Sequence, residues 1–361
     1  RLKRNAADGL FTKPSRIRLR VMSISHPPKI LMIQTGGIGD LLLALPALRA
    51  FRMAFPDSSP ELLGLPERLA LIAHDLGAVS IHSIHQAGLA HFYLKGGALP
   101  CRLVEFFSSF SAALLIGRSQ AETLAENLRR AGLARVIFLP SFPGEGERLH
   151  VSDALLKVLR SFGIEGKGSF SPLRLSGEAL SSADELLNKA GWKKGGRILA
   201  IHPGSGSPAK NWSPRKFALV ADWASERALI VLISGPARDG RDEVLKAVRK
   251  ARPFVLDQLP LPHLAAVLAK GTAFLGNDSG ITHLAARTGI PTVAIFGPTD
   301  PAVWGPRGPG VRIMTAEKPC VPCSSEERQA CPRSCLEEIE PEGVIKKIAP
   351  IFETGATSRR G

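Results

Sequence analysis

The stretch TAFLGNDSGITHLAARTGIPTVAIFG, residues 272–297, has the pattern of a strand, a helix and a second strand. Its two short apolar runs, 272–277 and 291–297, predict strands that are buried in the core of a sheet. Residues 280–288, which lie between them, predict a helix. Because strands that alternate with helices are typical of parallel sheets, this stretch indicates an α/β fold.

The same alternation extends over most of the chain. In the N-terminal half we expect strands at 29–34, 61–65, 79–84, 112–117 and 136–140, and helices at 39–55 and 119–132. In the C-terminal half we expect further strands at 197–204, 228–235 and 253–257, and helices at 213–226, 238–250 and 261–270. The pattern predicts two Rossmann-like, doubly wound domains that face a cleft at the carboxyl ends of their strands.

A segment rich in Gly, Ser and Pro, residues 163–178, separates the two series and is typical of a domain boundary. We therefore expect one domain at 29–170 and a second at 171–340. A last helix and a frayed tail are expected at 341–361. Residues 1–28 are strongly basic and show little periodicity, which predicts a disordered arm.

The composition of the whole chain limits the class of protein to which it can belong. With 361 residues, 44% hydrophobic and 22% charged, it is typical of a soluble globular protein. We see no apolar run that could span a bilayer and no secretory signal, so we expect a cytoplasmic protein. The net charge of +15 favours anionic partners such as anionic lipid or phosphorylated glycans, although the basic arm can equally be a solvated tail. Aromatic residues are only 6% of the chain and form no basic-aromatic repeat, so nucleic acid is not an expected partner.

The first polar loop at a strand end is QTGGIGD, residues 34–40. Its glycines, Gly36, Gly37 and Gly39, allow a ligand to approach the N-terminus of the next helix closely. The loop matches neither the dinucleotide fingerprint nor a Walker A motif, which argues against a dehydrogenase and a P-loop kinase. Asp40 can be a catalytic carboxylate or simply an acid that stabilises the first helical turn.

The second loop, HPGSGSPAKNW, residues 202–212, follows a strongly apolar strand. Small residues such as Ser205 and Gly206 can wrap a phosphate with backbone donors, and the ammonium of Lys210 can neutralise its charge. The alternative is that Lys210 is an ordinary surface lysine. His202 is interpreted as a hydrogen-bonded histidine at the end of a strand.

The third loop is the polar turn Asn277-Asp278-Ser279-Gly280. Ser279 or Asp278 can cap the next helix, so that the free N–H groups of its first turn point outward and form an anion site. His283 lies on the same side of that turn. Alone, the segment could be a well-capped helix with a core histidine. Together with the Ser-Gly-Lys loop in the same half, it favours a diphosphate site.

Four of the five cysteines lie close together, in the pattern CxxC followed by CxxxC. They could hold a structural zinc ion, or they could be reduced thiols packed in a loop. These candidate ligands are Cys320, Cys323, Cys331 and Cys335.

Three blocks carry a resemblance to a known family. They are KILMIQTGGIGDLLLALPALRAFRMAFP (29–56), AIHPGSGSPAKNWSPRKFA (200–218) and FLGNDSGITHLAARTGIPTVAIFGPTDPAVWGPRG (274–308). In this order they resemble glycosyltransferase family 9, the ADP-heptose:lipopolysaccharide heptosyltransferases. The resemblance covers most of residues 29–350, and its third block is the most specific.

The resemblance implies a GT-B fold with the acceptor in the first domain, the nucleotide-sugar in the second, and the last helix packed back on the first. It implies an inverting, metal-independent enzyme without a cofactor that moves heptose from ADP-heptose to the Kdo- or heptose-lipid A inner core. Such an enzyme would lie at the cytoplasmic face of the inner membrane, with a lipid-linked anionic glycan as acceptor. No acidic counterpart of a family residue that contacts the donor ribose is found at 234–236.

The resemblance also implies roles for single residues. Asp40 matches the base that deprotonates the acceptor hydroxyl, and Lys210 matches the lysine that stabilises the departing diphosphate. Ser205 falls where a hydroxyl contacts phosphate. The donor-binding segment corresponds to Asp278, Ser279, Gly280, Thr282 and His283. The alternatives are transfer of another nucleotide-sugar, a related sugar epimerase, and a nucleotide-binding protein without catalysis.

Overall fold

The structure is a computed structural model that describes residues 27–144, 147–166, 168, 170–235, 240–318, 320–323 and 334–354. Four parts of the expectations from the sequence fall wholly or almost wholly outside these ranges. They are the basic arm, the tail after residue 354, the position of Cys331, and part of the predicted helix at 238–250.

The first domain contains a sheet of five parallel strands in the order β3-β2-β1-β4-β5. These strands are β1 (Lys29–Gln34), β2 (Ser59–Gly64), β3 (Ser80–Ser83), β4 (Phe110–Gly117) and β5 (Val136–Pro140). The helices are α1 (Ile38–Ala54), α2 (Pro66–Leu76), α3 (Cys101–Ser108), α4 (Ala121–Arg130) and α5 (Val151–Ser161), with a 3₁₀ turn η1 (Leu89–Tyr93). The central strand β1 is almost wholly buried, as expected for a parallel strand that is covered on both faces.

The second domain contains a sheet of six parallel strands in the order β11-β10-β9-β6-β7-β8. These are β6 (Ile198–His202), β7 (Leu229–Ser234), β8 (Phe254–Asp257), β9 (Ala273–Asn277), β10 (Thr292–Phe296) and β11 (Val311–Thr315). The longer helices are α6 (Gly177–Lys189), α7 (Pro214–Ala224), α8 (Arg241–Ala247), α9 (Leu261–Lys270), α10 (Gly280–Thr288) and α14 (Pro341–Thr354). The short ones are η2 (Pro208–Lys210), α11 (Pro301–Trp304) and α13 (Ser334–Glu337). The two parallel sheets confirm the expected α/β class.

Each sheet reverses its strand order once, and both reversals point to the same region. In the first sheet the chain moves outward from β1 to β3, then returns to the other side of β1 with β4. In the second sheet it moves from β6 to β8, then returns beside β6 with β9. Loops diverge at such switch points and leave a crevice for a ligand at the carboxyl ends of the strands.

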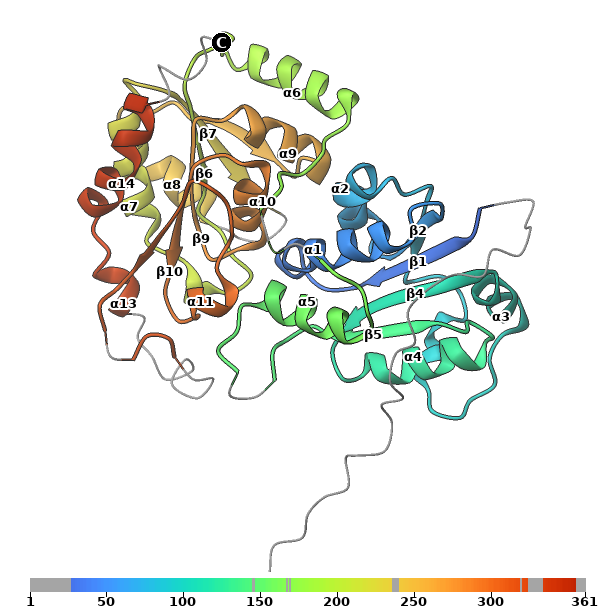
Figure 1. The fold of residues 1–361 in the computed structure, drawn as a ribbon. Coiled ribbons are helices and arrows are strands. Elements are labelled where there is room, and N and C mark those ends of the chain that lie inside the picture. The colour runs from blue at the N-terminus through green and yellow to red at the C-terminus, as the bar shows by residue number, and fades with distance from the viewer. Residues whose placement is uncertain are drawn as a thin grey trace, which may run out of the picture.

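The two domains share a continuous apolar interface, in which α1 and α2 of the first domain pack against α10 and α9 of the second (Figure 1). The backbones of the two domains come close together at Gly280. A Cβ atom added there would lie 2.8 Å from the Cβ of Ile38 and 3.0 Å from the backbone nitrogen of Gly39. The N-termini of α1 and α10 therefore meet directly, and a side chain at Gly280 would have to displace Ile38 or Gly39.

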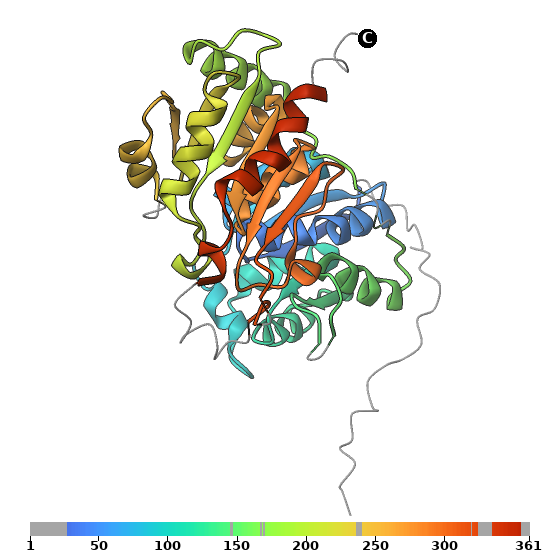
Figure 2. The same ribbon diagram turned by 90° about the vertical axis from the view of Figure 1, so that its left-hand side faces the viewer.

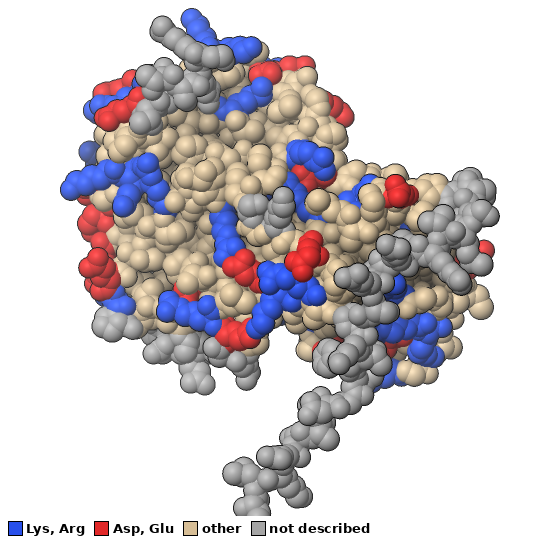
Figure 3. Space-filling view, in the orientation of Figure 1, with Lys and Arg blue, Asp and Glu red and all other residues tan. Residues whose placement is uncertain are grey.

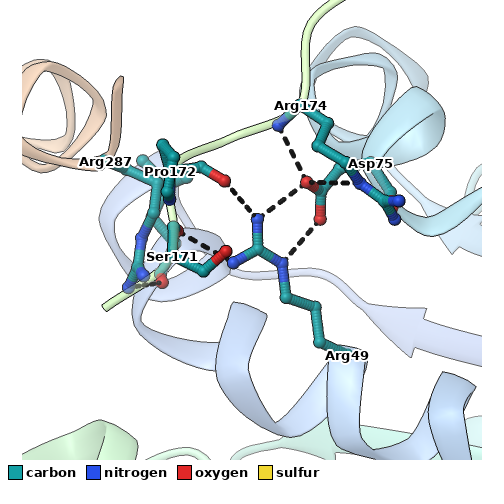
Figure 4. A network of polar contacts seen from close by, with 7 residues as sticks. Arg49, Asp75, Ser171, Pro172, Arg174 and Arg287 are labelled. Carbon is teal, nitrogen blue, oxygen red and sulfur yellow. Dashed lines mark hydrogen bonds and ion pairs between the residues drawn. The ribbon is translucent and has the colours of Figure 1, made fainter. Parts of the chain in front are cut away.

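The chain that crosses between the domains is held by a buried ion-pair network (Figure 4). Arg49 on α1 contacts both carboxylate oxygens of Asp75 at 2.7 Å, and it also donates to the carbonyls of Ser171 and Pro172. The backbone N–H of Arg174 donates to Asp75 at 2.9 Å. Burial alone would raise the pKa of Asp75, but the hydrogen bonds from Arg49 and Arg174 outweigh it and hold this pKa below its ordinary value.

The expected position of the last helix is wrong. We expected it to pack back on the first domain, but α14 packs against α7, β9 and β10 of the second (Figures 1 and 2). Its apolar side chains, including Val344 and Ile348, are buried in the core of that domain, and Phe352 stacks on Trp223. This apolar face completes the cover of the second sheet, which accounts for its location.

Candidate active site

A cavity of about 500 Å³ lies between the domains, beside the point where α1 and α10 meet. From the first domain it is lined by Gly39 and Asp40 on α1. From the second domain it is lined by Gly206 and Lys210 on the loop after β6, and by Asp278, Ser279, Gly280 and His283 at the start of α10. These residues lie far apart in the sequence, and each of them is a candidate site residue predicted from the sequence. The fold brings them together around this cavity.

Asp40 lies in the first turn of α1 and is half-buried. Its Oδ2 accepts a hydrogen bond of 2.9 Å from the backbone N–H of Gly37. Gly36 permits this fold of the loop, because an added Cβ would lie 2.8 Å from both the Cβ and the Oδ2 of Asp40. The carbonyl of Gly36 is held in turn by Arg68 at 2.8 Å. The loop therefore fixes the carboxylate while leaving it at the wall of the cavity.

Lys210 lies in η2, and its ammonium is 2.7 Å from Oδ2 of Asp278. The Thr299 hydroxyl donates to the same oxygen. Asn277 joins the two loops, since its side chain accepts from the N–H of Trp212 and donates to the carbonyl of Pro203. The ammonium is thus held at the cavity by an acid from the neighbouring strand end.

The N-terminus of α10 is capped by a neutral group. Ser279 accepts a hydrogen bond of 3.3 Å from the N–H of Thr282. His283, one turn into the helix, is buried against Gly39 of the other domain. Burial lowers the pKa of His283 to about 4, although the nearby Asp278 opposes this shift. The imidazole is therefore neutral at pH 7, and the positive end of the helix dipole points into the cavity without a carboxylate on the cap.

Some predicted site residues do not line this cavity. The hydroxyl of Thr282 is fully buried and donates to the carbonyl of Asn277. Ser205 lies within its own loop, with its Oγ 2.6 Å from Oδ1 of Asn211. Both hydroxyl groups form hydrogen bonds within their own loops. Neither side chain lines the cavity at which a direct contact with the ligand is expected.

An adjoining cavity of about 320 Å³ lies inside the first domain and shares Asp40, Arg118 and Phe142 with the larger one. Gly36 and Gly37 line it, as do Arg68 and Arg118. Sequence reasoning missed Arg118, although the expected strand at 112–117 ends immediately before it. Residues directly after a parallel strand face the ligand crevice, and this was the signal that could have identified Arg118.

Aromatic and charged contacts close one side of the site. Phe142 packs edge-on against Trp304 of the other domain at 5.2 Å, and Arg118 lies over the same Phe142 ring. Arg148 pairs with Asp300 at 2.7 Å across the interface. Figure 3 shows basic and acidic side chains that meet along the boundary between the two domains on this face. The loop 296–308, whose role the sequence left open, thus forms part of the domain contact.

The cysteine cluster is only partly described. Cys320 is exposed, whereas Cys323 and Cys335 are buried. Within the part of the chain that the structure describes, no group of three or more His, Cys, Asp or Glu side chains is arranged to hold a metal ion. Because Cys331 lies outside that part, the four-cysteine metal site stays an untested prediction.

Comparison with known proteins identifies the family. Residues 122–332 match the family model described as glycosyltransferase family 9 (heptosyltransferase). The chain belongs to this family. Family 9 relatives include lipopolysaccharide heptosyltransferase 3 of Escherichia coli K12, which is 23% identical over 287 residues, or 74% of this chain and 82% of that protein. The chain is therefore a glycosyltransferase, as its three sequence blocks predicted.

Solved structures of the family share the fold. The glycosyltransferase family 9 protein of Veillonella parvula superposes with a TM-score of 0.76 at 18% identity, covering 94% of this chain and all of that one (100%). The E. coli heptosyltransferase WaaC with ADP gives a TM-score of 0.61 at 17% identity, with 89% and 99% of the chains covered. This family member therefore has the expected GT-B fold. Over the described residues, no helix is both long and apolar enough to cross a membrane.

Proposed function

We propose that this family 9 enzyme transfers a heptose, with inversion, from ADP-heptose to the inner core of lipopolysaccharide, without a metal ion. The observation that carries the proposal is the arrangement of the interdomain cavity. A carboxylate on the first domain, Asp40, faces a lysine and a helix N-terminus on the second, Lys210 and α10. One wall can thus accept a proton while the other binds a leaving anion.

Asp40 is assigned as the general base. It would take the proton from the acceptor hydroxyl as that oxygen attacks the anomeric carbon, and the bond from that carbon to the diphosphate would break on the opposite face. Inversion in a single displacement requires only one carboxylate. The hydrogen bond from Gly37 supports this role, because it fixes the orientation of the carboxylate before the substrate binds.

Lys210 and the N-terminus of α10 are assigned to the diphosphate. Both place positive charge where negative charge develops on the leaving group, which is the role that a divalent cation has in other transferases. Asp278 would hold the ammonium in position until the diphosphate shares it. Gly206 and Ser279 would offer backbone donors from the two adjoining loops.

The donor and acceptor are assigned by similarity and charge. The relatives named above include a lipopolysaccharide heptosyltransferase and a heptosyltransferase solved with ADP, which support ADP-heptose as the donor. Arg68 in the adjoining cavity and Arg118, which lines both cavities, suit an anionic acceptor such as Kdo- or heptose-lipid A. The net charge of +15 supports work at the anionic cytoplasmic face of the inner membrane.

Calorimetry with ADP, UDP, GDP and CDP, with EDTA present, tests the donor assignment. We expect selective binding of ADP and a weaker affinity in Lys210→Ala. A preference for UDP or GDP would keep the enzyme class but replace heptose by another sugar. If no nucleotide binds, the diphosphate site itself is wrong. Transfer from ADP-heptose to Kdo-lipid A and to heptosylated core, again with EDTA, then tests the acceptor and the metal independence.

A further inference from the structure

A second interdomain cavity of about 470 Å³ lies toward the other end of α10. Its walls come from α1 (Pro46), α5 (Ser152), the crossing segment (Phe170), α10 (Arg287) and the region around β11 (Arg307, Ile313). Among the described residues, none that lines this cavity also lines the cavity at Asp40. The two cavities are therefore separate spaces on the same domain interface.

Arg287 is the unusual residue of this cavity, because it is a deeply buried cation that is 6% exposed. Its Nη2 donates to the Leu42 carbonyl at 3.4 Å, a long contact, and its guanidinium lies 5.7 Å from the Phe170 ring centre. Within the described part of the chain, no carboxylate oxygen lies within 4.0 Å of it. Burial lowers the pKa of Arg287 to about 10, and the neighbouring Arg49 acts in the same direction, although the charge of Asp75 opposes this shift. The group still carries its charge at pH 7.

The neighbouring charges are already paired with each other. Asp75, the acid drawn in Figure 4 whose charge acts on Arg287, is bound by Arg49 and Arg174. Arg307, the other arginine of the cavity, makes two hydrogen bonds to Asp153 at 2.8 and 2.6 Å. Of the two arginines that line the cavity, one is therefore neutralised by a carboxylate and the other is not.

A buried guanidinium with five N–H donors and one long hydrogen bond is costly unless an anion compensates it. The rest of the wall is largely apolar, with Pro46, Phe170 and Ile313 beside the arginine. We propose that this cavity binds a small amphiphilic anion, whose carboxylate or phosphate head contacts Arg287 and whose short apolar body packs on Phe170 and Ile313. Such a ligand would touch both domains and the segment that joins them.

Calorimetry and thermal shift on the full chain test the proposal with hexanoate and hexyl phosphate at millimolar concentration. Acetate and inorganic phosphate supply the head alone, and hexanol supplies the body alone. We expect the two amphiphiles to raise the Tm more than any of these three controls, and the tighter of the two identifies the head group. If neither amphiphile binds, the proposal is overturned.

Variants locate the binding. Arg287→Met should weaken amphiphile binding roughly ten- to one-hundred-fold, as expected when a charged hydrogen bond is lost, whereas Arg287→Lys should weaken it less. Lys210→Met, at the other cavity, should leave it unchanged. Without ligand, Arg287→Met should keep or raise the Tm, because it removes an uncompensated buried charge.

A second variant keeps the test valid if Arg287→Met does not fold. Ile313→Trp leaves the arginine in place but fills the cavity, so it should also abolish amphiphile binding. Wild-type affinity in either Arg287→Met or Ile313→Trp would overturn the site, and so would loss of amphiphile binding in Lys210→Met. Because none of these measurements needs sugar transfer, they succeed or fail independently of the proposed function.

Discussion

The N-termini of α1 and α10 face one cavity from opposite domains, but they are capped differently. In α1 the carboxylate of Asp40 accepts the N–H of Gly37, so the helix end is neutralised by its own acid. In α10 the neutral hydroxyl of Ser279 accepts the N–H of Thr282, and the ammonium of Lys210 lies nearby, paired with Asp278. Two helix ends at equivalent switch points thus differ in their capping group, and only the end of α10 has a lysine beside it. This difference suits one for accepting a proton and the other for binding an anion.

The largest expected effect tests the N-terminus of α1, where Asp40 lies. Asp40→Asn should lower kcat by ~10²–10⁴-fold, the usual contribution of a general base. Nucleotide affinity, measured by calorimetry, should change little because the donor binds the other wall. Glu67→Gln is the matched control, since Glu67 is an exposed acid in the first turn of α2. Unchanged turnover in Asp40→Asn would remove the assignment of the base.

The next largest effect tests the N-terminus of α10, beside which Lys210 lies. Lys210→Met should lower kcat by ~10²–10³-fold, as expected when one preorganised donor to a developing charge is lost. Lys270→Met is a close control. The Lys270 side chain is 22% exposed and pairs with Asp184 at 2.7 Å, compared with 25% and 2.7 Å to Asp278 for Lys210. Equal steady-state rates in the two variants would show that the ammonium of Lys210 has no special role.

The pH dependence of stability tests the neutral state of His283. The unfolded imidazole titrates near pH 6.5, whereas the pKa in the folded protein is about 4. Between these values the unfolded state binds more protons, so stability is full above pH 6.5 and is lost as the pH falls toward 4. The loss should be about 3 kcal/mol. Denaturant unfolding at pH 7 and pH 4.5 should show a smaller loss in His283→Asn, but not in the exposed control His85→Asn.

The smallest expected effect tests the contact between the two helix ends. Gly280→Ala should destabilise the protein by about 1–3 kcal/mol, because the new methyl group must displace Ile38 or the backbone of Gly39. Gly177→Ala, at the start of α6, has nothing within 4 Å of its added Cβ and should be nearly neutral. The same Tm for both variants would mean that the helix ends are less tightly packed than described.

The sequence was sufficient for the elements whose pattern is local. Apolar runs located β1, β6, β9 and β10, and the turn residues after them located Asp40, Lys210 and the start of α10. The last strand, β11, was missed because Arg312 and half-exposed neighbours at the sheet edge give it no continuous apolar run. The position of α14 was wrong because an apolar helix face shows that it is covered, but not which domain covers it.

The sequence could not show which loops lie side by side. That depends on the strand order, and neither the pairing of β1 with β4 nor that of β6 with β9 is encoded near these residues. Arg118 enters the site only through the first pairing, and Lys210 meets Asp278 only through the second. Ser205 and Thr282 do not line the cavity because short hydroxyl side chains often bond to their own loop, which spacing alone does not reveal.

The ion-pair network that holds the crossing segment has a consequence for protein engineering. Gly163 forms an exposed turn after α5, whereas residues 171–174 are bound to the first domain through Arg49 and Asp75. A cut at Gly163 would therefore leave the second fragment with an irregular segment that docks on the first, beside a broad apolar interface. The two halves should work as a split enzyme, whose activity is recovered when separately produced fragments are mixed.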